Sequence, residues 1–208
     1  GLVGCSQLFL RLTKCNLQCS YCDTDFSAGT FCATPWGDVP NPLSVQHIVE
    51  HAFPPPFPIH SISVTGGEPL LEPEFIRQLA KAVSSKIYLE TNGTLPEALM
   101  EVIEYIDFIS MDWKLDIRLW KLHEAFLQIA IAKQKNIYLK IVYQLEEKQL
   151  LQKALKQIHR ISPEVLVFLQ PAEPQTDYQK LLDCFFQMIQ YHPNIRFLPQ
   201  IHKWLGVR

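Results

Sequence analysis

The 208-residue sequence has no excess of charge of either sign, because 19 Lys and Arg residues face 21 Asp and Glu residues for a formal net charge of −2. This balance gives no support for a nucleic-acid-binding or membrane-binding surface. The sequence also lacks an apolar run near the ~20 residues that span a bilayer, and it has no stretch resembling a signal peptide. We therefore expect a protein of the reducing cytoplasm.

Internal repeats, low-complexity segments and obvious linkers are missing as well, so we expect a single domain spanning residues 1–208. With 48% apolar and 19% charged residues, the composition is that of an ordinary globular protein with a substantial core. Six cysteines in a chain without a secretory signal are not expected to form a disulfide framework. Their thiols are therefore available for other chemistry.

Short runs of β-branched or aromatic residues alternate with longer helical segments along the chain. The expected strands are residues 8–12, 59–64, 86–89, 107–110, 137–142, 165–169 and 195–198, and the expected helices are 44–52, 73–84, 96–105, 117–133, 146–161 and 178–191. Residues 27–42 are expected to form a long loop. Repeated strand–helix units predict an α/β fold with a parallel sheet, and about six or seven units are too few for a complete eightfold barrel.

Polar segments with unusual composition follow the expected strands. In parallel α/β folds, ligands bind at the C-terminal ends of the strands. Several separate loops therefore point to one site, and the segments concerned are 15–24, 65–69, 90–94, 110–114 and 170–173.

The strongest local signal is the group Cys15, Cys19 and Cys22, which directly follows the first expected strand. Its spacing, C-x3-C-x2-C, differs from the paired C-x2-C knuckles of structural zinc sites. Three soft sulfur ligands without a nearby fourth suit an iron–sulfur cluster with one iron left open for chemistry. The alternative is that the three cysteines are buried or incidental.

The other cysteines carry weaker signals. Cys184 shares a helix face with apolar residues and is expected in the core, and Cys5 is expected to be structural. Cys32 is a candidate fourth ligand or part of a second site, although it has no partner cysteine at metal-binding spacing.

The cysteine motif, with Tyr21 before its last cysteine, resembles that of the radical S-adenosylmethionine (radical SAM) superfamily. The resemblance implies an incomplete TIM-type barrel of parallel strands, the radical SAM core, with a [4Fe–4S] cluster on the three cysteines. S-adenosylmethionine would bind the open iron, and its reductive cleavage would give a radical that abstracts hydrogen from the substrate. The segment Thr65-Gly66-Gly67-Glu68-Pro69 fits the same superfamily, in which it binds the amino group of S-adenosylmethionine.

Finer matches over nearly the whole chain resemble the 7-carboxy-7-deazaguanine synthases, and they lie at residues 22–24, 90–94, 110–114 and 202–208. This resemblance implies contraction of the ring of 6-carboxy-5,6,7,8-tetrahydropterin to 7-carboxy-7-deazaguanine with loss of ammonia, on the pathway to queuosine and other deazapurines. It also implies a Mg²⁺ ion, a homodimer and an electron donor such as flavodoxin.

The family's roles are carried over position by position. The Thr24 hydroxyl would bind Mg²⁺, which commonly takes few protein ligands. The implied contacts to S-adenosylmethionine are Tyr21, Gly67, Glu68, Asn92, Ser110, Lys114, Gln170, Pro171, Ala172 and Glu173. The implied contacts to the substrate are Arg11, Thr65, Glu90, His202 and Arg208, the last through the C-terminal carboxylate.

Three of these residues also have an ordinary structural interpretation. Thr24 could cap a turn through its hydroxyl. Arg11 could be an exposed strand arginine, although apolar neighbours on both sides favour burial and therefore a paired partner. Glu90 could pair with a helix or with Lys114 instead of lining the site.

The sequence departs from the family pattern in two ways. It starts at Gly1, so we expect the family's N-terminal strand and its Gln-Gly-Glu-Gly substrate loop to be missing from it. It also has a compact cysteine spacing where many members carry an insertion. Two competing interpretations are an activating enzyme of the same superfamily, which forms a glycyl radical on a partner protein, and a zinc-binding interaction domain.

Overall fold

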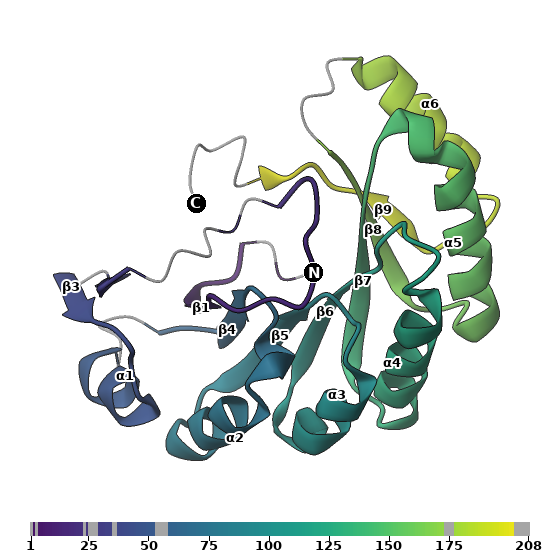
Figure 1. Cartoon of the computed structure of the whole chain (residues 1–208). Coiled ribbons are helices and arrows are strands. Elements are labelled where there is room, and N and C mark those ends of the chain that lie inside the picture. Colours follow the sequence, from purple (N-terminus) through teal and green to yellow (C-terminus); the bar gives the residue numbers. More distant parts are fainter. Residues whose placement is uncertain are drawn as a thin grey trace. The chain divides into compact units, whose positions relative to one another are not determined.

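The computed structural model describes residues 2, 4–22, 24, 29–34, 37–52, 58–172 and 177–201. The chain forms two compact units, of which the first comprises residues 1–90 and 97–108 and the second residues 91–96 and 109–208. Each unit contains neighbouring parallel strands that are joined by helices (Figure 1). The parallel pairing confirms the predicted α/β class and is compatible with an incomplete barrel.

The first unit contains three parallel strands in the order β1-β4-β5. The elements in this part of the chain are β1 (Gln7–Leu12), β2 (Phe31–Thr34), β3 (Gly37–Pro40), α1 (Val45–Ala52), β4 (Ser61–Gly66), η1 (Pro69–Leu71), α2 (Pro73–Ala82), β5 (Lys86–Thr91), α3 (Pro96–Val102) and η2 (Ile103–Tyr105). The apolar stripe of α2 places Ile76 and Leu79 in the core with no exposed surface. The Ser44 hydroxyl caps α1 by accepting the His47 N–H at 3.1 Å.

The expectation of a loop over residues 27–42 is wrong for residues 31–34 and 37–40, which form two strands. Strands β2 and β3 pair antiparallel, with Phe31 opposite Pro40 and Thr34 opposite Gly37. The Thr34 hydroxyl donates to the Gly37 carbonyl at 2.5 Å, and Gly37 has a φ of +118° that suits glycine. Four-residue strands are too short to give a clear periodic pattern in the sequence.

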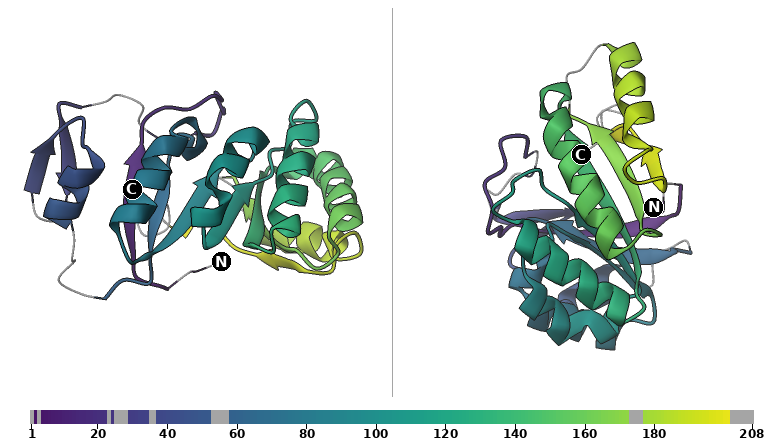
Figure 2. Two further views of the ribbon diagram at one scale, coloured as in Figure 1. Left: turned by 90° about the horizontal axis from the view of Figure 1, so that it is seen from below. Right: turned by 90° about the vertical axis from the view of Figure 1, so that its right-hand side faces the viewer.

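The second unit contains the order β6-β7-β8-β9. Its elements are β6 (Phe108–Asp112), α4 (Trp120–Ala132), β7 (Asn136–Tyr143), η3 (Leu145–Glu147), α5 (Lys148–Ile161), β8 (Leu166–Pro171), α6 (Tyr178–Met188) and β9 (Ile195–Phe197). Helices α4 and α5 both contact β7, and α5 lies between α4 and α6 (Figure 2). Leu139, Ile141 and Tyr143 on β7 are fully buried, whereas Lys140 points to the opposite face and is half-buried.

Several strands extend further toward their carboxyl ends than the sequence predicted. Strand β5 includes Thr91, β6 includes Asp112 and β8 includes Pro171. The polar segments at the strand ends are therefore held partly by the sheet itself, which restricts their backbone.

The described helices are all too short or too polar to cross a bilayer.

Candidate active site

The cysteine loop leaves the carboxyl end of β1. Cys15 and Cys19 are half-buried, Cys22 is exposed, and all three are free thiols. The Cys22 N–H donates to the Cys19 carbonyl at 3.1 Å, and the Leu17 N–H lies 3.5 Å from the Cys15 sulfur. The loop therefore turns tightly between its second and third cysteines.

The thiols of this loop have the chemistry that an iron–sulfur cluster needs. Three soft sulfur donors suit iron, and three protein ligands would leave one iron of a [4Fe–4S] cluster open. In the described part of the chain, however, no three Cys, His, Asp or Glu side chains are gathered closely enough to hold a metal ion. The donor set therefore fits the cluster by its chemistry, although the three sulfur atoms do not form such a group in the described chain.

Gly66 and Gly67 lie directly against the start of the cysteine loop. The Gly67 N–H donates to the Leu12 carbonyl at 2.6 Å, and the Glu68 N–H donates to the Lys14 carbonyl at 2.7 Å. Gly66 has a φ of +104°, and an added Cβ would overlap the backbone of Leu12 there and the carbonyl of Lys14 at Gly67. Both positions therefore require glycine, because the two backbones are in contact.

Glu68 has a structural task in addition to its predicted one. Its side chain is fully buried, and its Oε1 accepts the Leu70 N–H at 3.0 Å, which caps the short helix η1. The carboxylate is thus fixed by the turn that follows β4. Its contact with the amino group of S-adenosylmethionine stays a prediction.

Arg11 and Thr65 are partners in the parallel register of β1 and β4. Their side chains therefore lie next to each other on one face of the sheet. Thr65 is 9% exposed, whereas Arg11 is exposed, so the expected burial of Arg11 is wrong. The Arg11 guanidinium lies 5.5 Å from the ring centre of Phe9, which is 48% exposed. The Arg11 guanidinium near the carboxyl end of β1 therefore lies beside the buried hydroxyl of Thr65 on β4.

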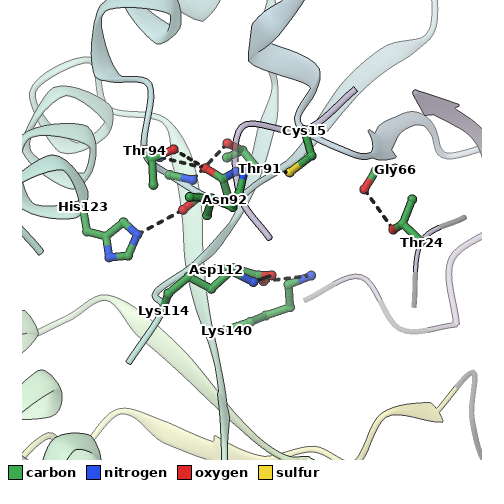
Figure 3. A network of polar contacts seen from close by, with 12 residues as sticks. Cys15, Thr24, Gly66, Thr91, Asn92, Thr94, Asp112, Lys114, His123 and Lys140 are labelled. Carbon is green, nitrogen blue, oxygen red and sulfur yellow. Dashed lines mark hydrogen bonds and ion pairs between the residues drawn. The ribbon is translucent and has the colours of Figure 1, made fainter. Parts of the chain in front are cut away.

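Thr24 connects the far end of the cysteine loop to the glycine turn. Its hydroxyl donates to the Gly66 carbonyl at 3.3 Å, and the residue is half-buried (Figure 3). This contact agrees with the structural interpretation of Thr24. The hydroxyl oxygen keeps its lone pairs for a further partner, because it uses only its hydrogen here.

Glu90, near the carboxyl end of β5, has a partner that the sequence did not indicate. The Ser63 hydroxyl on β4 donates to Glu90 Oε1 at 3.4 Å. Ser63 is fully buried, and Glu90 is half-buried. The carboxylate therefore has a polar neighbour within the sheet, and its role toward the substrate stays a prediction.

In the second unit, the Asp112 carboxylate lies between two ammonium groups (Figure 3). Lys114 Nζ is 2.9 Å from one carboxylate oxygen, and Lys140 Nζ is 3.4 Å from the other. Burial alone would raise the pKa of Asp112, but Lys114 and Lys140 together lower it to about 2. The carboxylate stays ionised at neutral pH, and the three side chains carry one net positive charge.

Residues 91–94 form a loop that is closed by its own side chains (Figure 3). The Thr91 hydroxyl accepts the Gly93 N–H at 3.1 Å, and Asn92 Oδ1 accepts both the N–H and the hydroxyl of Thr94, at 3.0 and 2.6 Å. Asn92 is buried, so its side-chain oxygen shapes the loop. Its predicted contact with S-adenosylmethionine stays a prediction.

His123 on α4 supports the same loop. Its Nε2 lies 3.1 Å from the Asn92 carbonyl, and since a carbonyl only accepts, the imidazole donates. Burial lowers the pKa of His123 to about 4, although the bond to Asn92 acts in the opposite direction. The ring is therefore neutral at pH 7.

The remaining predicted residues are distributed over both units. Ser110 is fully buried, and its hydroxyl has no hydrogen-bond partner among the described residues. Gln170 is half-buried, and Pro171 and Ala172 are buried at the end of β8. Tyr21 is half-buried. The predicted contacts Glu173, His202 and Arg208 lie outside the described residues.

Sequence reasoning missed Ser63, His123 and Lys140. Lys140 had a usable signal, since it is a charged residue between Leu139 and Ile141 in an apolar strand. Ser63 and His123 had none, because a serine in a strand or a histidine in a helix is common.

The cysteines outside the loop divide into three cases. Cys184 on α6 is buried as predicted, and burial raises the pKa of its thiol. Cys5 is exposed, so its expected structural role is not supported. Cys32 lies in β2 and is half-buried, and it forms no metal-binding group with other described residues.

Comparison with known proteins places the chain in a family. A family model described as the Radical SAM superfamily matches residues 10–114. The 7-carboxy-7-deazaguanine synthases of Methanothermobacter thermautotrophicus, Archaeoglobus fulgidus and Geobacter sulfurreducens are each 31% identical to the chain. Their alignments cover 100%, 99% and 99% of this chain and 92%, 92% and 91% of the relatives. The chain belongs to the 7-carboxy-7-deazaguanine synthase family of the radical SAM superfamily.

A likeness to a solved structure agrees with this family assignment at the level of the fold. The structure of a tagged protein described as "anSMEcpe with bound AdoMet" has a TM-score of 0.61 and 15% sequence identity. The alignment covers 97% of this chain and 64% of that one. Membership of the radical SAM superfamily implies a [4Fe–4S] cluster and S-adenosylmethionine as cofactors, and Cys15, Cys19 and Cys22 lie within the matched residues.

Proposed function

We propose that the chain is a radical SAM lyase that converts 6-carboxy-5,6,7,8-tetrahydropterin to 7-carboxy-7-deazaguanine and ammonia. The observation that carries this proposal is 31% identity to synthases of that name over essentially the whole chain. These relatives favour the ring contraction over the formation of a glycyl radical on a partner protein. Superfamily membership likewise argues against a zinc-binding interaction domain.

The cysteine loop would hold the cluster, which supplies the electron for reductive cleavage of S-adenosylmethionine. The protein's own contribution is to fix this loop against the turn at Gly66 and Gly67. Because these contacts join two backbones, the start of the cysteine loop and the turn that is predicted to bind the cofactor must move together. Positioning of this kind is a general source of rate acceleration.

The substrate carboxylate would be bound by Arg11 and by a Mg²⁺ ion on Thr24. Arg11 offers an exposed guanidinium beside Thr65, and a guanidinium matches the two oxygens of a carboxylate. The Thr24 hydroxyl donates to Gly66 and can offer its oxygen to a hard cation. Both residues lie in the first unit of the chain.

The wider setting of the enzyme is also part of this proposal. We propose one radical SAM domain that forms a homodimer in the cytoplasm and receives electrons from a flavodoxin-type donor. The near-neutral charge of the chain supports a small-molecule substrate in place of a nucleic acid.

The direct test uses anaerobically reconstituted protein with the pterin, S-adenosylmethionine, Mg²⁺ and a chemical reductant. Mass spectrometry is expected to detect 7-carboxy-7-deazaguanine, and the Cys19→Ala variant should form none. Absence of product from wild-type protein with a full complement of iron and sulfide would refute the proposal.

A further inference from the structure

Two side chains at the start of α4 each donate a hydrogen bond to a main-chain carbonyl of a different loop. Trp120 Nε1–H donates to the Lys114 carbonyl at 3.0 Å, and His123 Nε2–H donates to the Asn92 carbonyl at 3.1 Å. Trp120 and His123 are three positions apart and so lie on the same side of the helix. One turn of α4 thus contacts the loop after β5 and the segment after β6.

Trp113 packs against both donors. Its ring centre is 5.2 Å from that of His123 and 6.3 Å from that of Trp120. Trp113 and His123 have no exposed surface, and Trp120 is 9% exposed. Aromatic packing of this kind in a close-packed interior leaves little room for the donors to change rotamer. The two hydrogen bonds are therefore held in a fixed geometry.

The two loops fixed in this way are those that the family resemblance assigns to S-adenosylmethionine. The Asn92 carbonyl belongs to the loop that is closed by Thr94. The Lys114 carbonyl belongs to the residue whose ammonium pairs with Asp112. Both bonds use main-chain carbonyls, so they fix the course of the backbone and leave the side chains of Asn92 and Lys114 to other partners.

We propose that Trp120 and His123 are positioning residues for S-adenosylmethionine, because they hold these two loops at a fixed spacing. The inference rests on the proposed function, since that function assigns the loops to the cofactor. Neither residue is expected to touch the cofactor itself. Loss of either donor should therefore weaken cofactor binding without a change in cluster content.

A matched control exists within the same unit. His192 is also fully buried, and its Nε2 lies 2.7 Å from the Val165 carbonyl. Val165 precedes β8, so this bond lies at the amino-terminal end of that strand and away from the loops at the carboxyl ends. Replacing His192 should cost comparable stability through the same loss of a buried hydrogen bond, but it should leave the loops intact.

The experiment measures equilibrium binding of S-adenosylmethionine to the anaerobically reconstituted holoenzyme, with iron and sulfide content and urea unfolding in parallel. His123→Leu and Trp120→Phe should each raise the dissociation constant about five- to tenfold, as expected for one buried hydrogen bond. His123→Gln, which keeps a side-chain donor, should recover most of the affinity. His192→Leu should stay within about twofold of wild type at similar loss of stability.

The proposal is overturned if His123→Leu or Trp120→Phe binds the cofactor as wild type does, or if His192→Leu weakens binding equally. If His123→Leu does not fold, the comparison between Trp120→Phe and His192→Leu decides. Failure of the wild-type holoenzyme to bind S-adenosylmethionine would overturn the proposed function together with this inference. Normal wild-type binding with unaffected variants would overturn this inference alone.

Discussion

Arg11 on β1 and Thr65 on β4 are register partners in a parallel strand pair, so two of the side chains predicted to contact the substrate stand next to each other. They differ in environment, since Thr65 is buried and Arg11 is exposed. A buried hydroxyl beside a solvent-facing cation is a suitable pair for a ligand that carries a carboxylate at one end.

Arg11→Lys should raise the KM for the pterin by about tenfold or more, because an ammonium cannot reproduce the two-point pairing of a guanidinium with a carboxylate. Its unfolding free energy should change by no more than about 0.5 kcal/mol, since Arg11 is exposed. Steady-state kinetics and urea unfolding measure the two effects. Arg160→Lys, at an exposed arginine on α5, is the control. An unchanged KM in Arg11→Lys would remove Arg11 from the substrate site.

Thr24→Val should abolish the stimulation of activity by Mg²⁺, whereas Thr24→Ser should retain it. Valine has nearly the shape of threonine but offers no oxygen to the metal. The lost bond to the Gly66 carbonyl should cost about 1 kcal/mol of stability in Thr24→Val. Activity titrated with Mg²⁺ in both variants separates the two roles. If Thr24→Val keeps the wild-type Mg²⁺ dependence, Thr24 is only a structural residue.

Gly67→Ala should prevent assembly of the cluster, because the added methyl group would overlap the Lys14 carbonyl at the entrance of the cysteine loop. A stability loss of at least about 2 kcal/mol is expected from this backbone clash. Iron and sulfide analysis with visible absorbance measures the cluster. Gly29→Ala, where the nearest atom to an added Cβ is 3.2 Å away, should reconstitute normally. Full cluster content in Gly67→Ala would show that the loop does not depend on this contact.

Lys140→Met should raise the pKa of Asp112 from about 2 toward its ordinary value, since one of its two cationic neighbours is removed. The lowered pKa contributes stability that is present above about pH 4 and is lost as the pH falls through about 2. The variant should therefore be less stable than wild type by about 1 kcal/mol at pH 7, and the difference should shrink as Asp112 protonates.

Urea unfolding measures this difference between pH 2 and pH 7, at those pH values where unfolding is reversible. Lys121→Met, at an exposed position of α4, is the matched control and should show no such pH-dependent difference. A Lys140→Met difference that is constant with pH would mean that Lys140 acts through packing and not through the charge of Asp112.

The strand–helix alternation was sufficient to predict the fold class, and the cysteine spacing singled out the loop that we propose as the cluster site. The environment of Arg11 was not predictable in the same way. Its apolar neighbours, Leu10 and Leu12, point to the opposite face of β1, and they do not indicate which strand lies at the edge of a sheet. Burial inferred from adjacent residues is therefore unreliable for a strand.

Pairings between distant segments account for the rest of what the sequence did not reveal. The bond from Ser63 to Glu90, the approach of Lys140 to Asp112 and the bond from His123 to Asn92 each join residues far apart in the chain. Such contacts depend on register and on helix placement, which a local pattern does not encode.

Measuring product, ammonia and remaining S-adenosylmethionine after many turnovers of the reconstituted enzyme tests the proposed ring contraction. We expect 7-carboxy-7-deazaguanine and ammonia in equal amounts, in excess of the S-adenosylmethionine consumed, because the family resemblance implies that the cofactor is regenerated after each turnover. Consumption of S-adenosylmethionine by a fully loaded enzyme without formation of 7-carboxy-7-deazaguanine would contradict the account.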